Sequence, residues 1–238
     1  MNQLKKGFLA AGAAGLALLT PACYIATDSG PLEHSSQSVD LRGAKSVEAD
    51  IEMGAGEIVM RGAAAGLMDA DFRYRGNAKP EVRYDVAGDR GALTVRQSPT
   101  QRHMGGNDKD QWDLRLNEDI PLDLRVKLGA GEGRLNLGSL ALRSVRVEMG
   151  AGELKLDLTG HPRGDVNVEV HGGVGSATVK LPRRARLDVE AHGGIGQINA
   201  QGLTKRDGRW VNEPEGRSEG SMRVTVNGGI GEINLICE

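Results

Sequence analysis

The stretch VEMGAGELKLDL, residues 147–158, contains the pattern that decides the fold. Apolar residues occupy every second position on both sides of the Gly-Ala-Gly centre, which is typical of a β-strand with one buried face. Across the centre the alternation slips by one step, and we assign the slip to Gly152 and Glu153, both off the apolar face. Two successive outward residues predict a bend that keeps the same face of the chain inward.

The Gly-x-Gly centre occurs six times, at intervals of 21, 23 and 21 residues between Gly129 and Gly194. A fixed period of this length is typical of stacked repeats. We therefore predict an all-β, β-solenoid-like stack of short strands, with repeats of about 21 residues and a corner at each centre. Glycine suits such corners because it allows positive φ and close backbone approach. The corner glycines are Gly54, Gly56, Gly129, Gly131, Gly150, Gly152, Gly173, Gly175, Gly194, Gly196, Gly229 and Gly231.

The residues beside the first corner glycine exchange volume between the early and the late repeats. Early repeats have a bulky residue before it and alanine after it, as in Met149 and Ala151. Late repeats have glycine before it and a bulky residue after it: Val174, Ile195 and Ile230. Because close-packed cores respond to volume, we expect the bulky side chain to fill the core on either side of the glycine.

The first residues have the features of an export signal. Lys5 and Lys6 precede an uncharged apolar run over residues 7–19, and small residues lead to Cys23. We interpret residues 1–22 as a signal peptide and Cys23 as a lipidation site, so that the chain is exported and held at a bacterial membrane by a lipid anchor. Residues 23–44 then form the lipidated cysteine and a flexible tether.

Residues 45–238 are predicted to form the β-solenoid domain, with two insertions. The first, residues 63–121, contains further alternating segments, which we interpret as strands of enlarged coils, with a turn at residues 88–91. The second, residues 204–220, is predicted to be a polar loop in which Trp210 and Val211 are the large apolar residues.

Composition argues against several classes of function. The net charge is −2 and only 3% of residues are aromatic, so the chain lacks the cationic surface and stacking rings of nucleic-acid-binding proteins. The corners lack the motifs of phosphate-binding loops, and no helix is predicted after them. We expect no cofactor and no catalytic residue. The second cysteine, Cys237, falls on an inward position and is expected to be a small core residue.

Several polar rows deserve separate interpretation. His171 and His192 hold equivalent outward places in consecutive repeats, where a solenoid would stack them about 4.8 Å apart. Without a third ligand we expect an exposed polar ladder and no metal site. Apolar residues replace the calcium-ligating aspartate of nonapeptide repeats, as at Ile198 and Ile233. Two surface features are expected to be solvated: the glutamate row of Glu57, Glu132, Glu153 and Glu232, and the arginine cluster of Arg183, Arg184 and Arg186.

The segments GAGEIVMRG, PLDLRVKLGAGEGRLNLGSL and LRSVRVEMGAGELKLDLTG resemble the bacterial toastrack-domain family, which is related to the C-terminal domains of cell-wall-active-antibiotic response proteins. The resemblance covers about residues 45–238. It implies stacked short β-strands, a cell-envelope setting and no established enzymatic activity.

We therefore expect a noncatalytic envelope lipoprotein that serves as a scaffold or protein-interaction module, with an envelope protein or a cell-wall polymer as partner. Two alternatives remain open: a regulatory domain that senses envelope stress through a membrane signalling protein, and, less favoured, a glycan-processing enzyme, for which paired carboxylates are not evident. Ile236 lies at an outward place on the last segment, so we expect an open sheet end covered by the loop with Trp210 or by a second protein.

Overall fold

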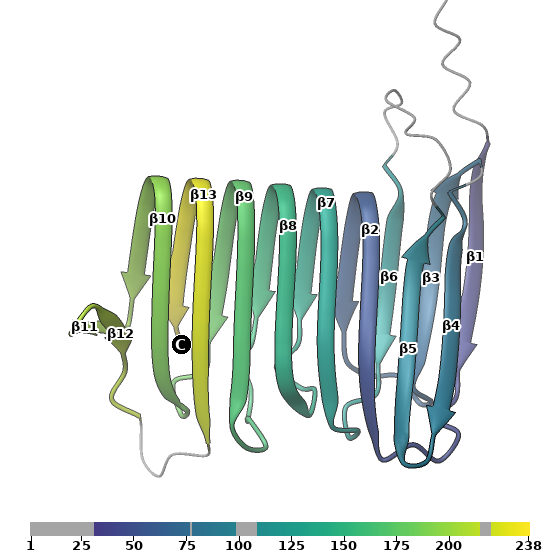
Figure 1. Cartoon of the computed structure of the whole chain (residues 1–238), viewed down its shortest axis with the longest axis horizontal. Coiled ribbons are helices and arrows are strands. Elements are labelled where there is room, and N and C mark those ends of the chain that lie inside the picture. The colour runs from purple at the N-terminus through teal and green to yellow at the C-terminus, as the bar shows by residue number, and fades with distance from the viewer. Residues whose placement is uncertain (1–30, 77, 99–108, 215–219) are drawn as a thin grey trace, which may run out of the picture.

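The computed structural model describes residues 31–76, 78–98, 109–214 and 220–238 (Figure 1). These residues contain thirteen β-strands and no helix, and therefore no helix that could cross a membrane. The strands are β1 (Leu32–Val39), β2 (Ser46–Arg61), β3 (Met68–Arg75), β4 (Pro80–Ala87), β5 (Arg90–Gln97), β6 (Gln111–Leu116), β7 (Leu122–Asn136), β8 (Leu142–Asp157), β9 (Val166–Leu181), β10 (Arg186–Gln201), β11 (Thr204–Arg206), β12 (Arg209–Val211) and β13 (Ser221–Cys237).

Six strands of 15 to 17 residues build the stack: β2, β7, β8, β9, β13 and β10. Each bends at its Gly-x-Gly centre into two legs, and each leg runs parallel to the same leg of its neighbour. Figure 1 shows these bent strands side by side, with their corners along one edge. The predicted all-β, solenoid-like stack is confirmed.

The spatial order departs from the order of the sequence at one place. The last strand, β13, lies between β9 and β10 and pairs in parallel with both. The expectation that the final segment forms an open end is therefore wrong. β10 is the last coil of the stack, and the small β11–β12 hairpin joins its edge. The hairpin occupies part of the region predicted as a polar loop.

The insertion at residues 63–121 forms strands, as predicted, but the expected enlarged coils are wrong. Without a Gly-x-Gly corner, each strand in this region serves only one leg of the stack. β5 extends the first leg of β2 and pairs with β4 across the predicted turn, whereas β6 extends the second leg and pairs with β3. The antiparallel pairs close the N-terminal end of the stack.

The tether expected over residues 23–44 is wrong at residues 32–39, which form β1 and pair antiparallel with β3. The strand is polar because it lies at an edge. Two of its serines hydrogen-bond to β3: Ser36 Oγ lies 2.6 Å from Asp71 Oδ1, and Ser38 Oγ lies 2.6 Å from Asp69 Oδ1. The bond from Ser36 lowers the pKa of the Asp71 carboxyl, against a smaller opposing effect of desolvation.

The core lies between the two layers of legs. Val147, Val168, Val189 and Val224 are all buried there, as the alternation requires. Phe72 and Trp112 pack edge to face at the N-terminal end, with ring centroids 5.5 Å apart. The largest fully buried side chains are concentrated at this end of the molecule.

The corners show why glycine recurs. The second glycine of every corner has a positive φ between 130° and 147°. A Cβ on Gly131 would lie 1.8 Å from the carbonyl oxygen of Gly56, its partner in the next coil. At the first glycine of the corner, a Cβ on Gly129 would lie 2.3 Å from the oxygen of Gly54. Backbone packs against backbone here, so any side chain would push the coils apart.

Candidate interaction surface

The corners of the last three coils carry exposed apolar side chains. Val174, Ile230 and Ile195 are 55%, 52% and 71% exposed, and the register places them next to one another across β9, β13 and β10. We call these three residues the corner ridge. In the neighbouring coil, β8, the same position is held by Ala151. The ridge is therefore confined to the C-terminal half of the stack.

The expectation that bulky residues fill the core on either side of the corner glycine is wrong. In β8, Met149 is buried, Gly150 and Ala151 are exposed, and Leu154 is buried again. The slip in the alternation thus lies at Gly150 and Ala151, two residues earlier than we expected. A bulky residue before the first glycine points into the core, and one after it points to solvent.

A hollow lies beneath the ridge because glycine replaces the inward methionine or leucine. It has a volume of about 40 Å³ and is lined mainly by apolar side chains and corner glycines, with Ser176, Asn227 and Glu232 also on its wall. Met149, Val170 and Ile233 form part of its wall, and Gly172 and Gly228 stand where the early coils have bulky residues. The ridge and the hollow form one apolar feature. The sequence signal for it is the glycine that immediately precedes each late corner.

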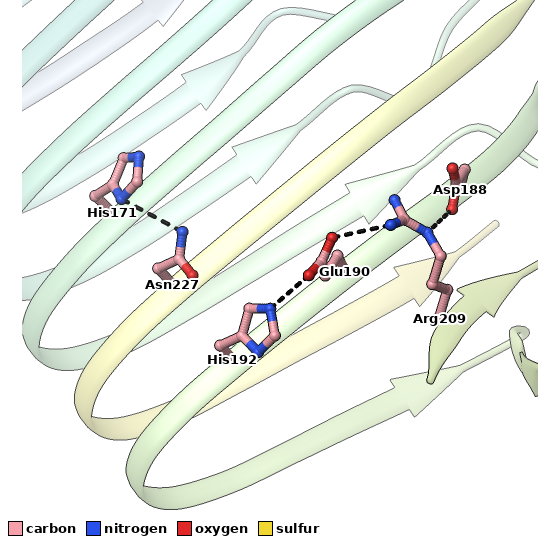
Figure 2. A network of polar contacts seen from close by, with 6 residues as sticks. All are labelled: His171, Asp188, Glu190, His192, Arg209 and Asn227. Atoms are coloured by element: carbon pink, nitrogen blue, oxygen red, sulfur yellow. Dashed lines mark hydrogen bonds and ion pairs between the residues drawn. The ribbon is translucent and has the colours of Figure 1, made fainter. Parts of the chain in front are cut away.

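A polar network lies on the outer face of the first legs, near the same coils (Figure 2). Glu190 Oε1 lies 2.7 Å from His192 Nε2, and Glu190 Oε2 lies 2.9 Å from Arg209 Nη1. Arg209 also pairs with Asp188, so it ties the β11–β12 hairpin to β10. The hydrogen bond with His192 and the charge of Arg209 lower the pKa of Glu190, partly offset by desolvation. The bond to Asp188 raises the pKa of Arg209.

The two histidines are not adjacent. Because β13 lies between β9 and β10, Asn227 separates His171 from His192, and its Nδ2 lies 3.5 Å from His171 Nδ1. The expected stacking of the two imidazoles on each other is therefore wrong, although both belong to a polar ladder with Glu148 and Asn227. Within the described ranges, no group of three or more His, Cys, Asp or Glu residues could hold a metal ion.

Three of the four glutamates in the row form ion pairs with basic residues of the same legs. Glu57, Glu132 and Glu153 stand in register across β2, β7 and β8. Arg134 pairs with the first two, and Lys155 Nζ lies 2.9 Å from Glu153 Oε1. Glu232 accepts a hydrogen bond of 2.7 Å from Asn199 Nδ2. The row is thus a network of ion pairs and hydrogen bonds on the surface.

The remaining predicted residues are dispersed. Trp210 lies half-buried on β12 opposite Val189, with Lys205 Nζ 5.2 Å from its ring centroid. Ile236 lies half-buried inside the sheet between Lys180 and Gln201, so the expected cover by the Trp210 loop is wrong.

Cys237 and the arginine cluster lie in the described part of the chain, whereas Cys23 does not. Cys237 is buried in the core. Arg183 binds the C-terminal segment through its backbone N–H, which donates to Glu238 O, while Arg184 lies against His161. Cys23 lies outside the described residues, as do the whole signal sequence and the first part of the tether.

Comparisons with known proteins agree with this fold. The family model described as "N-terminal domain of toast_rack, DUF2154" matches residues 28–180, so that β10 and β13 lie beyond the match. A crystal structure from Clostridium sporogenes, provisionally described as a cell adhesion protein, shares 30% sequence identity with a TM-score of 0.81 and covers 87% of this chain and 100% of its own. No curated protein sequence matches the chain.

A provisionally described adhesin from Bacteroides fragilis is 13% identical with a TM-score of 0.31, covering 87% of this chain and 97% of its own. The assignment rests on the family model, which matches more than half of the chain, and on the Clostridium structure. The TM-score of 0.81 shows that the Clostridium structure shares the fold of this chain. The chain therefore belongs to the toastrack family.

Proposed function

We propose that this protein is a noncatalytic interaction module of the bacterial cell envelope, anchored through Cys23 and binding a partner protein at the corner ridge. The observation that carries the proposal is a group of three adjacent aliphatic side chains, each more than half exposed: Val174, Ile230 and Ile195. Grouped apolar surface in a folded protein is characteristic of an interaction site. The adhesion role provisionally given to the Clostridium structure supports the same class of function.

The polar groups of the surface favour binding over catalysis. The carboxylates of the network at Asp188 and Glu190 are held by Arg209 and His192, and those of the glutamate row by Arg134 and Lys155. Catalytic acids and bases usually lie in a cleft and have pKa values moved toward neutrality. Here the pKa of Glu190 is moved the opposite way.

The ridge is tested by replacing its three residues with alanine, which is the residue that the early coils have at this position. A photoreactive amino acid at Ser176, beside the ridge, is used for crosslinking in intact cells, in the unmodified background and in the triple variant Val174→Ala, Ile195→Ala, Ile230→Ala. We expect the triple variant to lose the crosslinked partner. Leu32→Ala is the matched control, because Leu32 is 51% exposed at the far end of the stack. Equal crosslinking in the triple variant and the control would refute the ridge as the binding site.

The anchor is tested separately with Cys23→Ser. We expect the variant to move from the membrane fraction to the soluble exported fraction, because a lipid chain contributes about 0.8 kcal/mol per buried CH₂. Retention of the variant at the membrane, with the signal removed, would contradict lipid anchoring and leave the ridge to be judged on its own test.

A further inference from the structure

The second leg of β10, residues 195–201, forms the end of the stack. Along this leg β10 pairs with β13 on one side. On the other side, β12 reaches only Asp188 and Val189 in the first leg. Among the described strands none pairs with the outer side of residues 195–201, so their outward backbone groups form an open edge (Figure 1).

This edge lacks the charges that protect most edge strands. From Ala191 to Thr204 the sequence contains no Asp, Glu, Lys or Arg. The same leg of the interior coils is charged, as at Glu132, Lys155 and Glu232. Natural sheets usually place charged residues, proline or a covering element at an exposed edge, because a bare edge recruits another strand. Here the opposite holds: the interior strands carry charged residues in this leg, and the edge strand carries none.

The inward side of the same leg leaves the core incompletely covered. Ile198 and Ala200 are half-buried, whereas Ile233 and Leu235, their partners on β13, are buried. A strand added to this edge would continue the sheet and cover these apolar side chains in one step. The outward side chains there are Gln197, Asn199 and Gln201, which both donate and accept hydrogen bonds.

We propose that the second leg of β10 pairs antiparallel with the same leg of a second copy of this chain, forming a two-fold symmetric dimer with a continuous sheet. A two-fold axis sets a strand edge against itself in antiparallel orientation. Self-pairing requires that no like charges face each other, and an uncharged leg satisfies this. Amide side chains are self-complementary in the same way, and the half-buried Ile198 of each copy would be covered at the junction.

The test is the mass of the full chain by sedimentation equilibrium in density-matched detergent. We expect a dimer for the unmodified chain. Asn199→Lys should raise the dimer dissociation constant about tenfold or more, because the two-fold axis brings the added charges of the two copies together. Thr178→Lys is the matched control: Thr178 holds the same register position two strands inside, where β8 has Lys155. It should dimerise like the unmodified chain.

Circular dichroism establishes that the variants fold. A lysine at 199 lies near Glu232, which now accepts the Asn199 hydrogen bond, and should be tolerated. If it is not, Gln201→Lys replaces it, since Gln201 is exposed. A monomeric unmodified chain overturns the proposal, and so does an Asn199→Lys chain that dimerises normally. Loss of dimer in Thr178→Lys as well would also overturn it. The ridge variants are not used, so failure here leaves the proposed binding site unaffected.

Discussion

The two halves of the stack place the bulky corner residue on opposite sides of the same bend. In β2, β7 and β8 a methionine or leucine fills the space inside the corner, and an alanine lies outside. In β9, β13 and β10 the inside position is glycine, and the bulky residue lies in solvent. The backbone is the same in both halves, with the same register and the same positive φ at the second glycine.

The contrast separates what the fold requires from what it permits. Both halves need the corner glycines, because adjacent coils touch there through backbone atoms. Only the N-terminal half uses the neighbouring position for core packing. The C-terminal half gives up that packing, since about 40 Å³ remains unfilled, and exposes aliphatic surface instead. A loss of packing together with exposed apolar surface is expected where a surface serves binding.

The corner shared by both halves gives the largest expected effect. Gly131→Ala should lower the free energy of unfolding by more than about 4 kcal/mol or prevent folding, because its Cβ would overlap the oxygen of Gly56. Gly88→Ala is the control, with a φ of 60° and open space around the Cβ position, and should cost about 1–2 kcal/mol. Urea unfolding followed by circular dichroism measures both. Similar losses would show that backbone strain, rather than coil contact, fixes the corner glycine.

Alanine substitutions of the two tryptophans compare how much the two ends of the stack contribute to stability. Trp112→Ala removes a fully buried ring packed on Phe72 and should cost about 3–5 kcal/mol. Trp210→Ala removes a half-buried ring from a three-residue strand and should cost about 1 kcal/mol. Urea midpoints and slopes for the two variants give the comparison. An equal or larger loss at Trp210 would mean that the β11–β12 hairpin is an essential cap.

Filling the hollow should stabilise the C-terminal half. A Cβ on Gly172 would have only one atom at 4.0 Å, and its φ lies outside the region that favours glycine, so Gly172→Ala should raise the free energy of unfolding by about 0.5–1 kcal/mol. Gly228→Ala should gain less, because its Cβ would lie 3.1 Å from Ile233 Cδ1. Thermal unfolding measures both. A destabilised Gly172→Ala would indicate that the inside position is required empty for the fold itself.

The smallest effect is expected in the hairpin at low pH. The pKa of Glu190 is lowered in the folded chain, so its contribution is fully present above the pKa of the unfolded chain and is lost as pH falls through the folded pKa. We follow the chemical shift of the Trp210 indole by NMR from pH 7 to pH 3. It should change as Arg209 loses this partner, and the midpoint of the change should lie at a pH below the usual pKa of glutamate. Glu190→Gln should reduce the shift. An unchanged titration in that variant would assign the shift to another carboxyl, such as Asp188.

The sequence predicts the repeating part of this molecule well, because each coil repeats the same alternation and the same glycines. It fails where order in space departs from order in the chain. Nothing local in β13 distinguishes a terminal coil from an inserted one: Val224 and Val226 follow the same alternation as Val189 and Val168. β1 was missed for a different reason, since its pairing depends on backbone and Ser36–Asp71 hydrogen bonds instead of a buried face.

The corner ridge could not be placed because the slip in alternation has two possible positions. Assigning it to Gly152 and Glu153 puts Ala151, and hence Val174, inside, whereas the bend actually turns Gly150 and Ala151 outward. Alanine is uninformative at such a position, since it is common both inside and outside proteins. The glycines at 172, 193 and 228 carry the missing information, because a glycine without positive φ at the register position of an inward methionine or leucine marks an absent side chain.

The insertion of β13 between β9 and β10 constrains the order in which the coils can assemble during synthesis. Among the described strands, only β13 (Ser221–Cys237) bridges these two coils. Until residues 221–237 have emerged, β10 lacks the parallel neighbour that it has in the folded chain, and one side of β9 is unpaired. A nascent chain can thus complete its first coils vectorially but can join β10 to the stack only after residues 221–237 have been made, so that truncation before Ser221 removes the joint itself.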